Sequence, residues 1–159
     1  MLKEKGYYRH PTVAGGNVAF VSEDDIWTVP LAGGTARRLT TGLGACSGPF
    51  YSPDGKWIAF GSAEEGHREI FVIPAEGGPI RRLTHLGSLS TTVGWLDENT
   101  VLFRTDALDG IEMPTLATVA IAGGIPRSMH FGPATHIAIG PKVVIERNSH
   151  RADPAHWKR

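Results

Sequence analysis

The stretch VPLAGGTARRLT, residues 29–40, returns almost unchanged as IPAEGGPIRRLT at residues 73–84. A third, more divergent copy, VAIAGGIPRSMH, occupies residues 119–130. The copies are offset by 44 and then 46 residues (73 − 29 = 44; 119 − 73 = 46). Self-similarity with a period of about 40–50 residues is typical of repeat architectures, so this stretch decides the fold class.

Each copy closes a larger unit that reads as four short strands. In the second unit the turn SPDG is followed by KWIAFGS at 56–62 and EIFVIPA at 69–75, and the pair Gly77-Gly78 then turns the chain into PIRRLT. Such β-branched and aromatic runs favour strands, and paired glycines permit tight hairpins with positive φ. No sustained i, i+3, i+4 apolar pattern indicates a helix. The sequence therefore predicts an all-β protein made of β-propeller blades, each of four antiparallel strands.

The repeat places blade 1 at residues 7–40, blade 2 at 44–84 and blade 3 at 89–130. An incomplete blade 4 follows at 134–159, so residues 1–159 form one partial propeller of about three and a half blades. We expect the ring to be completed by the remainder of a longer protein or by further copies of the chain, as a homo-oligomer. Apolar blade faces left in water favour association, so we predict that the isolated chain is not a stable monomer.

Within the blades, the inner strands read as continuous apolar runs because both of their faces are covered. Trp27, Phe71 and Leu116 are expected at equivalent places on the third strands, filling the space between neighbouring blades. The arginine pairs of the repeated stretch lie on the outermost strand, where we expect their charges to discourage edge-to-edge pairing. The repeated stretch is thus predicted to be structural.

Composition narrows the function classes. Lys+Arg and Asp+Glu are both 16, so no net field attracts nucleic acid or an anionic membrane surface. The single cysteine, Cys46, excludes an internal disulfide, and no run approaches the ~20 apolar residues of a membrane helix. The N-terminus has no apolar core resembling a signal peptide. We expect a soluble, cytoplasmic protein.

The chain also resembles a known family. Units of the form SPDG, KWIAF and EIFVIPAEGG resemble the propeller repeats of TolB and its relatives. More closely, the stretch from residue 7 to 40, FGPATHIAIGP and ERNSHRADPAHWKR resemble successive parts of the first, six-bladed propeller of tricorn proteases. GPATH at 132–136 and HWKR at 156–159 carry this resemblance most specifically, since neither belongs to the general repeat. The resemblance covers only the first half of that propeller.

Tricorn proteases are large cytosolic serine peptidases of archaea and bacteria that trim oligopeptides, with propellers as gated channels. The resemblance implies a non-catalytic propeller segment that forms part of a channel gating substrate or product peptides. The family's catalytic Ser, His and Glu lie in C-terminal domains without a counterpart here. The arginine pair that holds the substrate's carboxylate in the type member is also missing from the matching loop, HLGSLSTT at 85–92. An alternative is a self-associating fragment that acts as a scaffold or a protein- or peptide-binding module.

No motif in the chain indicates chemistry of its own. No serine lies in a G-x-S-x-G elbow, Cys46 fits a buried packing role, and SEDD at 22–25 fits a solvated turn. A metal site from His150, Asp153 and His156 is only weakly indicated. We therefore expect no catalytic, cofactor or metal site.

His136 is the one residue with a candidate functional role. It begins the first strand of blade 4, and first strands line the central channel of a propeller. His136 is thus a candidate to line the channel and face a passing peptide, and a packing or turn role is equally compatible with the pattern.

Overall fold

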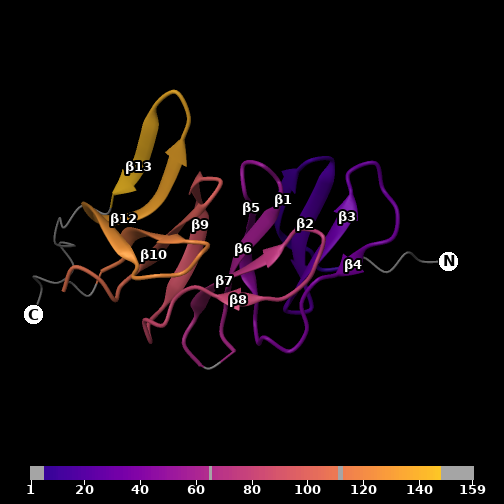
Figure 1. The fold of residues 1–159 in the computed structure, drawn as a ribbon, viewed down its shortest axis with the longest axis horizontal. Coiled ribbons are helices and arrows are strands. Elements are labelled where there is room, and N and C mark those ends of the chain that lie inside the picture. The colour runs from indigo at the N-terminus through magenta and orange to yellow at the C-terminus, as the bar shows by residue number, and fades with distance from the viewer. Residues whose placement is uncertain (1–5, 65, 111–112, 148–159) are drawn as a thin grey trace, which may run out of the picture.

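The computed structural model describes residues 6–64, 66–110 and 113–147, and every regular element in these ranges is a β-strand. The strands form three antiparallel sheets that stand side by side along the longest axis of the molecule, in chain order (Figure 1). The described part contains no helix that is long and apolar enough to cross a membrane. The prediction of an all-β fold with propeller blades is confirmed.

The first sheet consists of β1 (Arg9–Ala14), β2 (Asn17–Ser22), β3 (Asp25–Pro30) and β4 (Arg37–Arg38). The second repeats this order with β5 (Ser47–Tyr51), β6 (Trp57–Ser62), β7 (Glu69–Pro74) and β8 (Arg81–Arg82). Both sheets end in a two-residue outer strand that follows a glycine pair with positive φ. This conformation is accessible to glycine because it has no Cβ.

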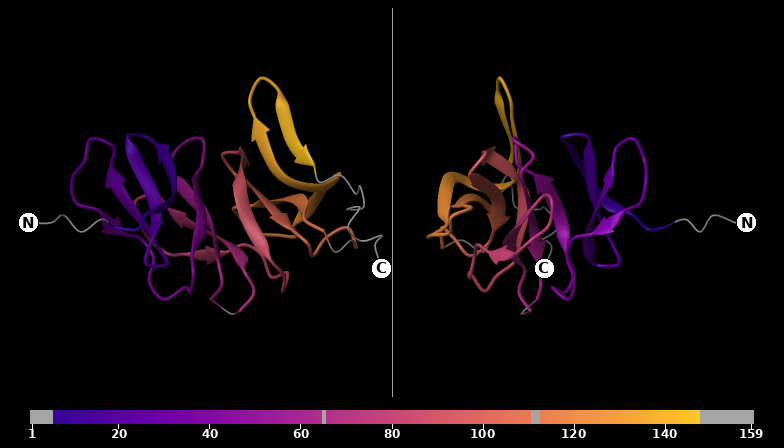
Figure 2. Two further views of the ribbon diagram at one scale, coloured as in Figure 1. Left: turned by 180° about the vertical axis from the view of Figure 1, so that it is seen from behind. Right: turned by 45° about the vertical axis from the view of Figure 1, so that its right-hand side comes forward.

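The third sheet has five strands: β9 (Ser90–Asp97), β10 (Thr100–Thr105), β11 (Thr115–Ala120), β12 (Arg127–Ile139) and β13 (Val143–Arg147). The first half of β12 pairs with β11 and its second half pairs with β13. The β12–β13 hairpin therefore stands away from the rest of the sheet, at the upper left of Figure 1 and also in the turned views of Figure 2. The blade limits given above stay predictions, because β12 runs without a break across the last of them.

The sheets pack face to face through two apolar clusters. In β6, Ile58 and Phe60 face the first sheet, whereas Ala59 faces the third, because successive side chains of a strand point to opposite faces. Strand β7 alternates in the same way, with Phe71 in the first cluster and Ile70 in the second. The second sheet is thus covered on both faces, as its continuous apolar strands predict.

One predicted equivalence is wrong. Trp27 and Phe71 are the third residues of β3 and β7, but the third residue of β11 is Ala117. Leu116 lies one position earlier, so it points to the opposite face of its sheet. The repeat offset of 46 residues itself relates Phe71 to Ala117 (117 − 71 = 46). The junction between the second and third sheets is filled instead by Phe103 and Trp95, together with aliphatic side chains.

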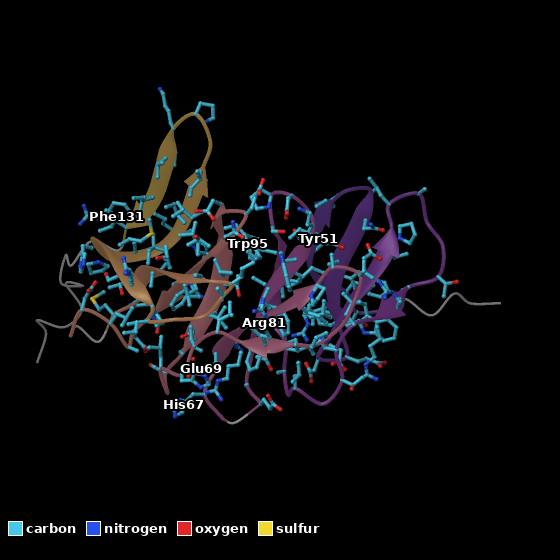
Figure 3. The ribbon with its side chains drawn as sticks, in the orientation of Figure 1. Tyr51, His67, Glu69, Arg81, Trp95 and Phe131 are labelled. Carbon is cyan, nitrogen blue, oxygen red and sulfur yellow. The ribbon has the colours of Figure 1, made fainter. Side chains whose placement is uncertain are left out.

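Two inner-strand aromatics tie each sheet to the one before it. The Tyr51 hydroxyl lies 3.2 Å from Thr28 Oγ1 of the first sheet. In the third sheet, Trp95 Nε1 donates to the Phe50 carbonyl at 2.9 Å. Tyr51 lies on β5 and Trp95 on β9, and Figure 3 labels both near the middle of the molecule. Each aromatic ring buries apolar surface between two sheets, and its hydroxyl or N–H group forms a hydrogen bond to the preceding sheet. These bonds fix one point of contact between each pair of neighbouring sheets.

Candidate functional site

A cavity of about 550 Å³, lined by both polar and apolar side chains, lies against the inner strands β1, β5, β9 and β12. Its lining contains five basic side chains, Arg9, His10, Arg68, Arg104 and His136, and no aspartate or glutamate among the described residues. We call this hollow, defined by these five residues, the inner-strand cavity. First strands of propeller blades face the central channel, so this is the side of the molecule on which a channel would run.

His136 lies on β12, opposite Glu146 of β13. Its Nδ1 shares a hydrogen bond of 2.6 Å with Glu146 Oε2, and its side chain is 64% exposed. His136 therefore stands at the solvent side of the inner-strand cavity with its ring orientation held by a carboxylate. That it lines a channel stays a prediction.

The two arginines Arg68 and Arg104 are the residues that the sequence reasoning missed. Arg104 is the fifth residue of β10, and the fifth residues of β2 and β6 are the buried Val21 and Gly61. When the repeats are aligned, the other two copies have a small or apolar residue at the position of Arg104. This difference in the sequence could have marked Arg104 as a candidate functional residue. Arg68 lies in the loop before β7 and reaches the cavity only through the fold, so no pattern could have found it.

The repeated stretch has a structural role that involves its last four residues. In the first sheet, Thr40 Oγ1 donates to the buried Asp25 Oδ1 at 2.7 Å, accepts from the Ile26 backbone N–H at 2.9 Å, and Arg38 forms an ion pair with Asp25. We call this arrangement of an acid, a threonine and an arginine the strand clamp. It joins the outer strand to the start of the third strand, where a buried carboxylate needs several donors.

The second sheet builds the same clamp from Glu69, Thr84 and Arg82. The Thr84 hydroxyl donates to Glu69, the Gly87 N–H donates to Glu69 Oε1 at 2.8 Å, and Arg82 lies 3.4 Å from the same oxygen. Glu69 is marked near the lower edge of the molecule in Figure 3. The second arginine of each pair is therefore a partner of a buried acid, beyond the edge-protecting role that the sequence predicts.

The third sheet has lost the clamp at both ends. Thr115 stands where the other sheets have an acid, and Ser128 pairs with Ala117 as Arg82 pairs with Phe71. Ser128 Oγ instead donates to Asp109 Oδ2 at 2.5 Å. A buried acid left without its arginine would be costly, and the third sheet has neither of the two at these positions.

Cys46 is 2% exposed and packs between the first and second sheets, as predicted. Burial raises the pKa of its thiol to about 11, and the nearby Asp25 carboxylate acts in the same direction, whereas a hydrogen bond with Thr40 opposes the shift. A thiol with so high a pKa is a poor nucleophile at neutral pH. Cys46 therefore acts as a packing residue.

Two serines near the start of β9, Ser88 and Ser90, have partners that form no catalytic arrangement within the described ranges. Ser88 bonds to Asp106 and Ser90 to Thr105, and no hydrogen bond there joins a histidine ring to a serine hydroxyl. The described residues also hold no group of three metal-ligating side chains. His150, Asp153 and His156 lie outside the described residues.

Residues 5–159 match the family model of the Tricorn protease N-terminal beta propeller domain. Tricorn protease homolog 1 of Streptomyces coelicolor is 37% identical over 155 residues, which cover 96% of this chain and 14% of that protein. A relative from Sulfurisphaera tokodaii, named as a Tricorn-like protease N-terminal subunit, is 34% identical over 160 residues, covering 97% of this chain and 80% of that protein.

Among solved structures, the crystal structure of the tricorn protease superposes with a TM-score of 0.79 at 25% identity, over 88% of this chain and 15% of that chain. TolB from Acinetobacter baumannii has the same fold, with a TM-score of 0.74 at 21% identity, over 93% of this chain and 39% of that chain. The chain thus spans about a seventh of the length of the Streptomyces relative and of the solved tricorn protease. With its repeated blades and this match over nearly its whole length, the chain belongs to the family of tricorn protease N-terminal β-propeller domains.

Proposed function

We propose that the chain is a non-catalytic propeller segment of a tricorn-like serine peptidase and lines part of a channel for oligopeptides. The observation that carries this proposal is the inner-strand cavity, where the inner strands of successive sheets meet around one hollow of about 550 Å³ with arginine and histidine side chains in its lining. Polar side chains in the wall can hydrogen-bond to the backbone N–H and C=O groups of a peptide in transit, beside the water that also satisfies them. His136, at the solvent side of the cavity, is the residue that we assign to the wall of this channel.

Two further observations support the proposal. The chain's relatives include proteins named tricorn protease in Thermoplasma acidophilum and Thermoplasma volcanium, at 27% and 25% identity. In the described residues Asp109 contacts both Ser128 and His130, but the His130 ring lies against the carboxylate and forms no hydrogen bond with the serine hydroxyl. This suits a segment that guides substrate and leaves hydrolysis to other parts of the protein. We propose the cytoplasm as its location and the remainder of the peptidase as its partner.

A thiol placed in the channel tests this role in the full-length protein. We would replace His136 with cysteine (His136→Cys) and attach a polyethylene glycol maleimide, which fills the inner-strand cavity. The matched control is Ile125→Cys, because Ile125 is 89% exposed on the loop leading to the outer strand of the third sheet. Cys46 contributes little background labelling, since it is buried.

We expect labelling at position 136 to slow the hydrolysis of long oligopeptides severalfold, with a smaller effect on short fluorogenic peptides, and labelling at position 125 to change neither. Equal rates after labelling at the two positions would contradict the channel role. So would a full-length protein with no peptidase activity before labelling.

The alternative, a self-associating scaffold, is favoured by one observation on the first sheet. Tyr8, 65% exposed, packs edge-on against Phe20 at 5.1 Å, beside Trp27 and a hollow of about 260 Å³ on the face of that sheet turned away from the second. Apolar faces of this kind are typical of association sites. Light scattering decides between the two: self-association of the isolated chain that Trp27→Glu abolishes supports a scaffold, and a monomer contradicts it.

A further inference from the structure

We propose that the inner-strand cavity binds a small oxyanion, either the carboxylate of a peptide or a free inorganic anion, between Arg68 and Arg104. This inference is independent of the channel role, because it concerns direct binding at the cavity and needs no peptidase activity. The chain as a whole has 16 Lys and Arg residues and 16 Asp and Glu residues, so three arginines around one hollow are a local concentration of positive charge.

The three arginines of the cavity differ in what they contact. Arg9 already has an acidic partner, with its guanidinium 3.1 Å from Asp24 Oδ1. Arg68 and Arg104 have no ion pair with any described residue. Both side chains are half-buried, so water screens them less than it screens a surface arginine. Arg68 and Arg104 both line the cavity, and no carboxylate is among its described lining residues. Guanidinium N–H groups match the oxygens of an oxyanion in geometry and charge, so this is where we place the anion.

Buried polar atoms without a partner collect at the same place. Among the described residues five side-chain atoms of this kind occur, and four of them belong to residues that line the cavity. These are Arg9 Nε, Ser47 Oγ, Arg68 Nε and Thr92 Oγ1. A buried donor without an acceptor is costly, and such groups are rare in folded proteins. An oxyanion offers acceptors to the guanidinium and to both hydroxyl groups.

Gly61, which has no side chain, leaves room in β6 for the side chains of Arg68 and Ser47. A Cβ built on Gly61 would lie 3.0 Å from Arg68 Cδ and 3.2 Å from Ser47 Oγ. Arg68 therefore crosses the sheet over Gly61, at the strand position that Arg104 occupies in β10. Arg68 in the second sheet and Arg104 in the third thus lie at equivalent strand positions, although the two arginines come from different places in the repeat.

The inner strands are also distorted beside the cavity. The register of β1 shifts between Arg9 and Thr12, and that of β5 shifts between Ser47 and Phe50. At these bulges His10 has a φ of 52° and Gly48 a φ of 54°. A non-glycine residue with positive φ is strained, and bulges often re-aim side chains at functional sites. Here the bulges turn the ends of β1 and β5 toward the hollow.

The test is calorimetric titration of the protein at low ionic strength with three probes. The probes are inorganic phosphate, an acetylated tripeptide with a free carboxylate, and the same tripeptide with a C-terminal amide. The variants are Arg68→Gln, Arg104→Gln and Gly61→Ala, whose new methyl group displaces Arg68. The matched control is Arg127→Gln, which removes the same charge from an exposed position on the outer part of β12. Circular dichroism establishes that each variant is folded.

We expect binding of at least one anionic probe, about 10-fold weaker in Arg68→Gln and in Arg104→Gln and unchanged in Arg127→Gln, because each lost arginine removes charge-assisted hydrogen bonds. Preference for the free tripeptide over its amide assigns the site to a peptide carboxylate, and preference for phosphate assigns it to a free anion. The proposal is overturned if the wild-type protein binds neither anion, or if Arg127→Gln weakens binding as much as the cavity variants. Should Arg68→Gln not fold, Arg104→Gln and Gly61→Ala carry the same comparison.

Discussion

The first and second sheets are built from nearly the same sequence pattern, yet their environments differ. Phe60 of β6 is fully buried, whereas Phe20, at the same place in β2, is only partly covered, chiefly by Tyr8. Both face the preceding blade, and only the second sheet has one within this chain. The comparison teaches that a repeat specifies a blade, while the neighbouring blade determines how much that blade contributes to stability.

Replacing each of the two equivalent phenylalanines with alanine should give the largest difference in stability between the first and second sheets. We expect Phe60→Ala to lower the free energy of unfolding by about 3–5 kcal/mol, because it leaves a cavity in a closed junction. Phe20→Ala should cost about 1–2 kcal/mol, since the ring is already partly in water. Urea denaturation of the two variants measures the difference. Equal losses would mean that the outer face of the first sheet is covered in solution.

The strand clamps of the first and second sheets also differ in how much they should contribute to stability. Glu69→Ala should cost about 2–3 kcal/mol, because the Thr84 hydroxyl and the Gly87 N–H lose a buried acceptor. Asp25→Ala in the first sheet should cost less, since its arginine partner Arg38 is 45% exposed and can be hydrated. Thermal unfolding of the two variants checks this order. A larger loss for Asp25→Ala would show that arginine hydration does not decide the strength of a clamp.

Cys46 reports on the junction between the first and second sheets. Its pKa of about 11 lies two units above the ordinary value of 9.0, so at pH 8 its thiolate population is about 100-fold below that of a free cysteine. We expect iodoacetamide to modify the native protein at least that much more slowly than the protein in urea, as followed by mass spectrometry. Similar rates in the two states would mean that the junction opens readily.

The smallest effect on stability is expected at the turn between the first two strands of the second sheet. The second sheet has Asp54 there, where the first has Gly15-Gly16. The Ser52 hydroxyl and Lys56 lower the pKa of Asp54 to about 2. A lowered pKa stabilises the fold above the unfolded value near 4, and this contribution is lost as the pH falls toward 2. NMR titration should give that midpoint, and Asp54→Asn should remove this part of the acid sensitivity. A midpoint near 4 would contradict the turn geometry.

Much of the fold could be predicted because the same four-strand pattern occurs three times in the sequence, so each copy supports the assignment of the others. The hairpin turns, the continuous apolar strands and the buried place of Cys46 all follow from local pattern and alternation. Leu116 was misplaced because apolar residues occupy both faces of a covered strand, so hydrophobicity alone does not give the register. The strand clamp was missed because its acid and its threonine are separated by a hairpin. Asp25 and Glu69 recur at the same offset of 44 residues (69 − 25 = 44), but no local pattern indicates that each carboxylate meets the threonine and the arginine of the outer strand.

The amino-acid sequence by itself determined the blade, its period and the family to which the chain belongs, because these depend on short-range turns, alternation and motif spacing. Only the tertiary structure decided which face of each sheet is covered, which arginines meet buried acids, and that Arg68 and Arg104 approach one cavity. Such contacts join residues from different strands and sheets. They are set by how the sheets stack, and no local pattern records that geometry.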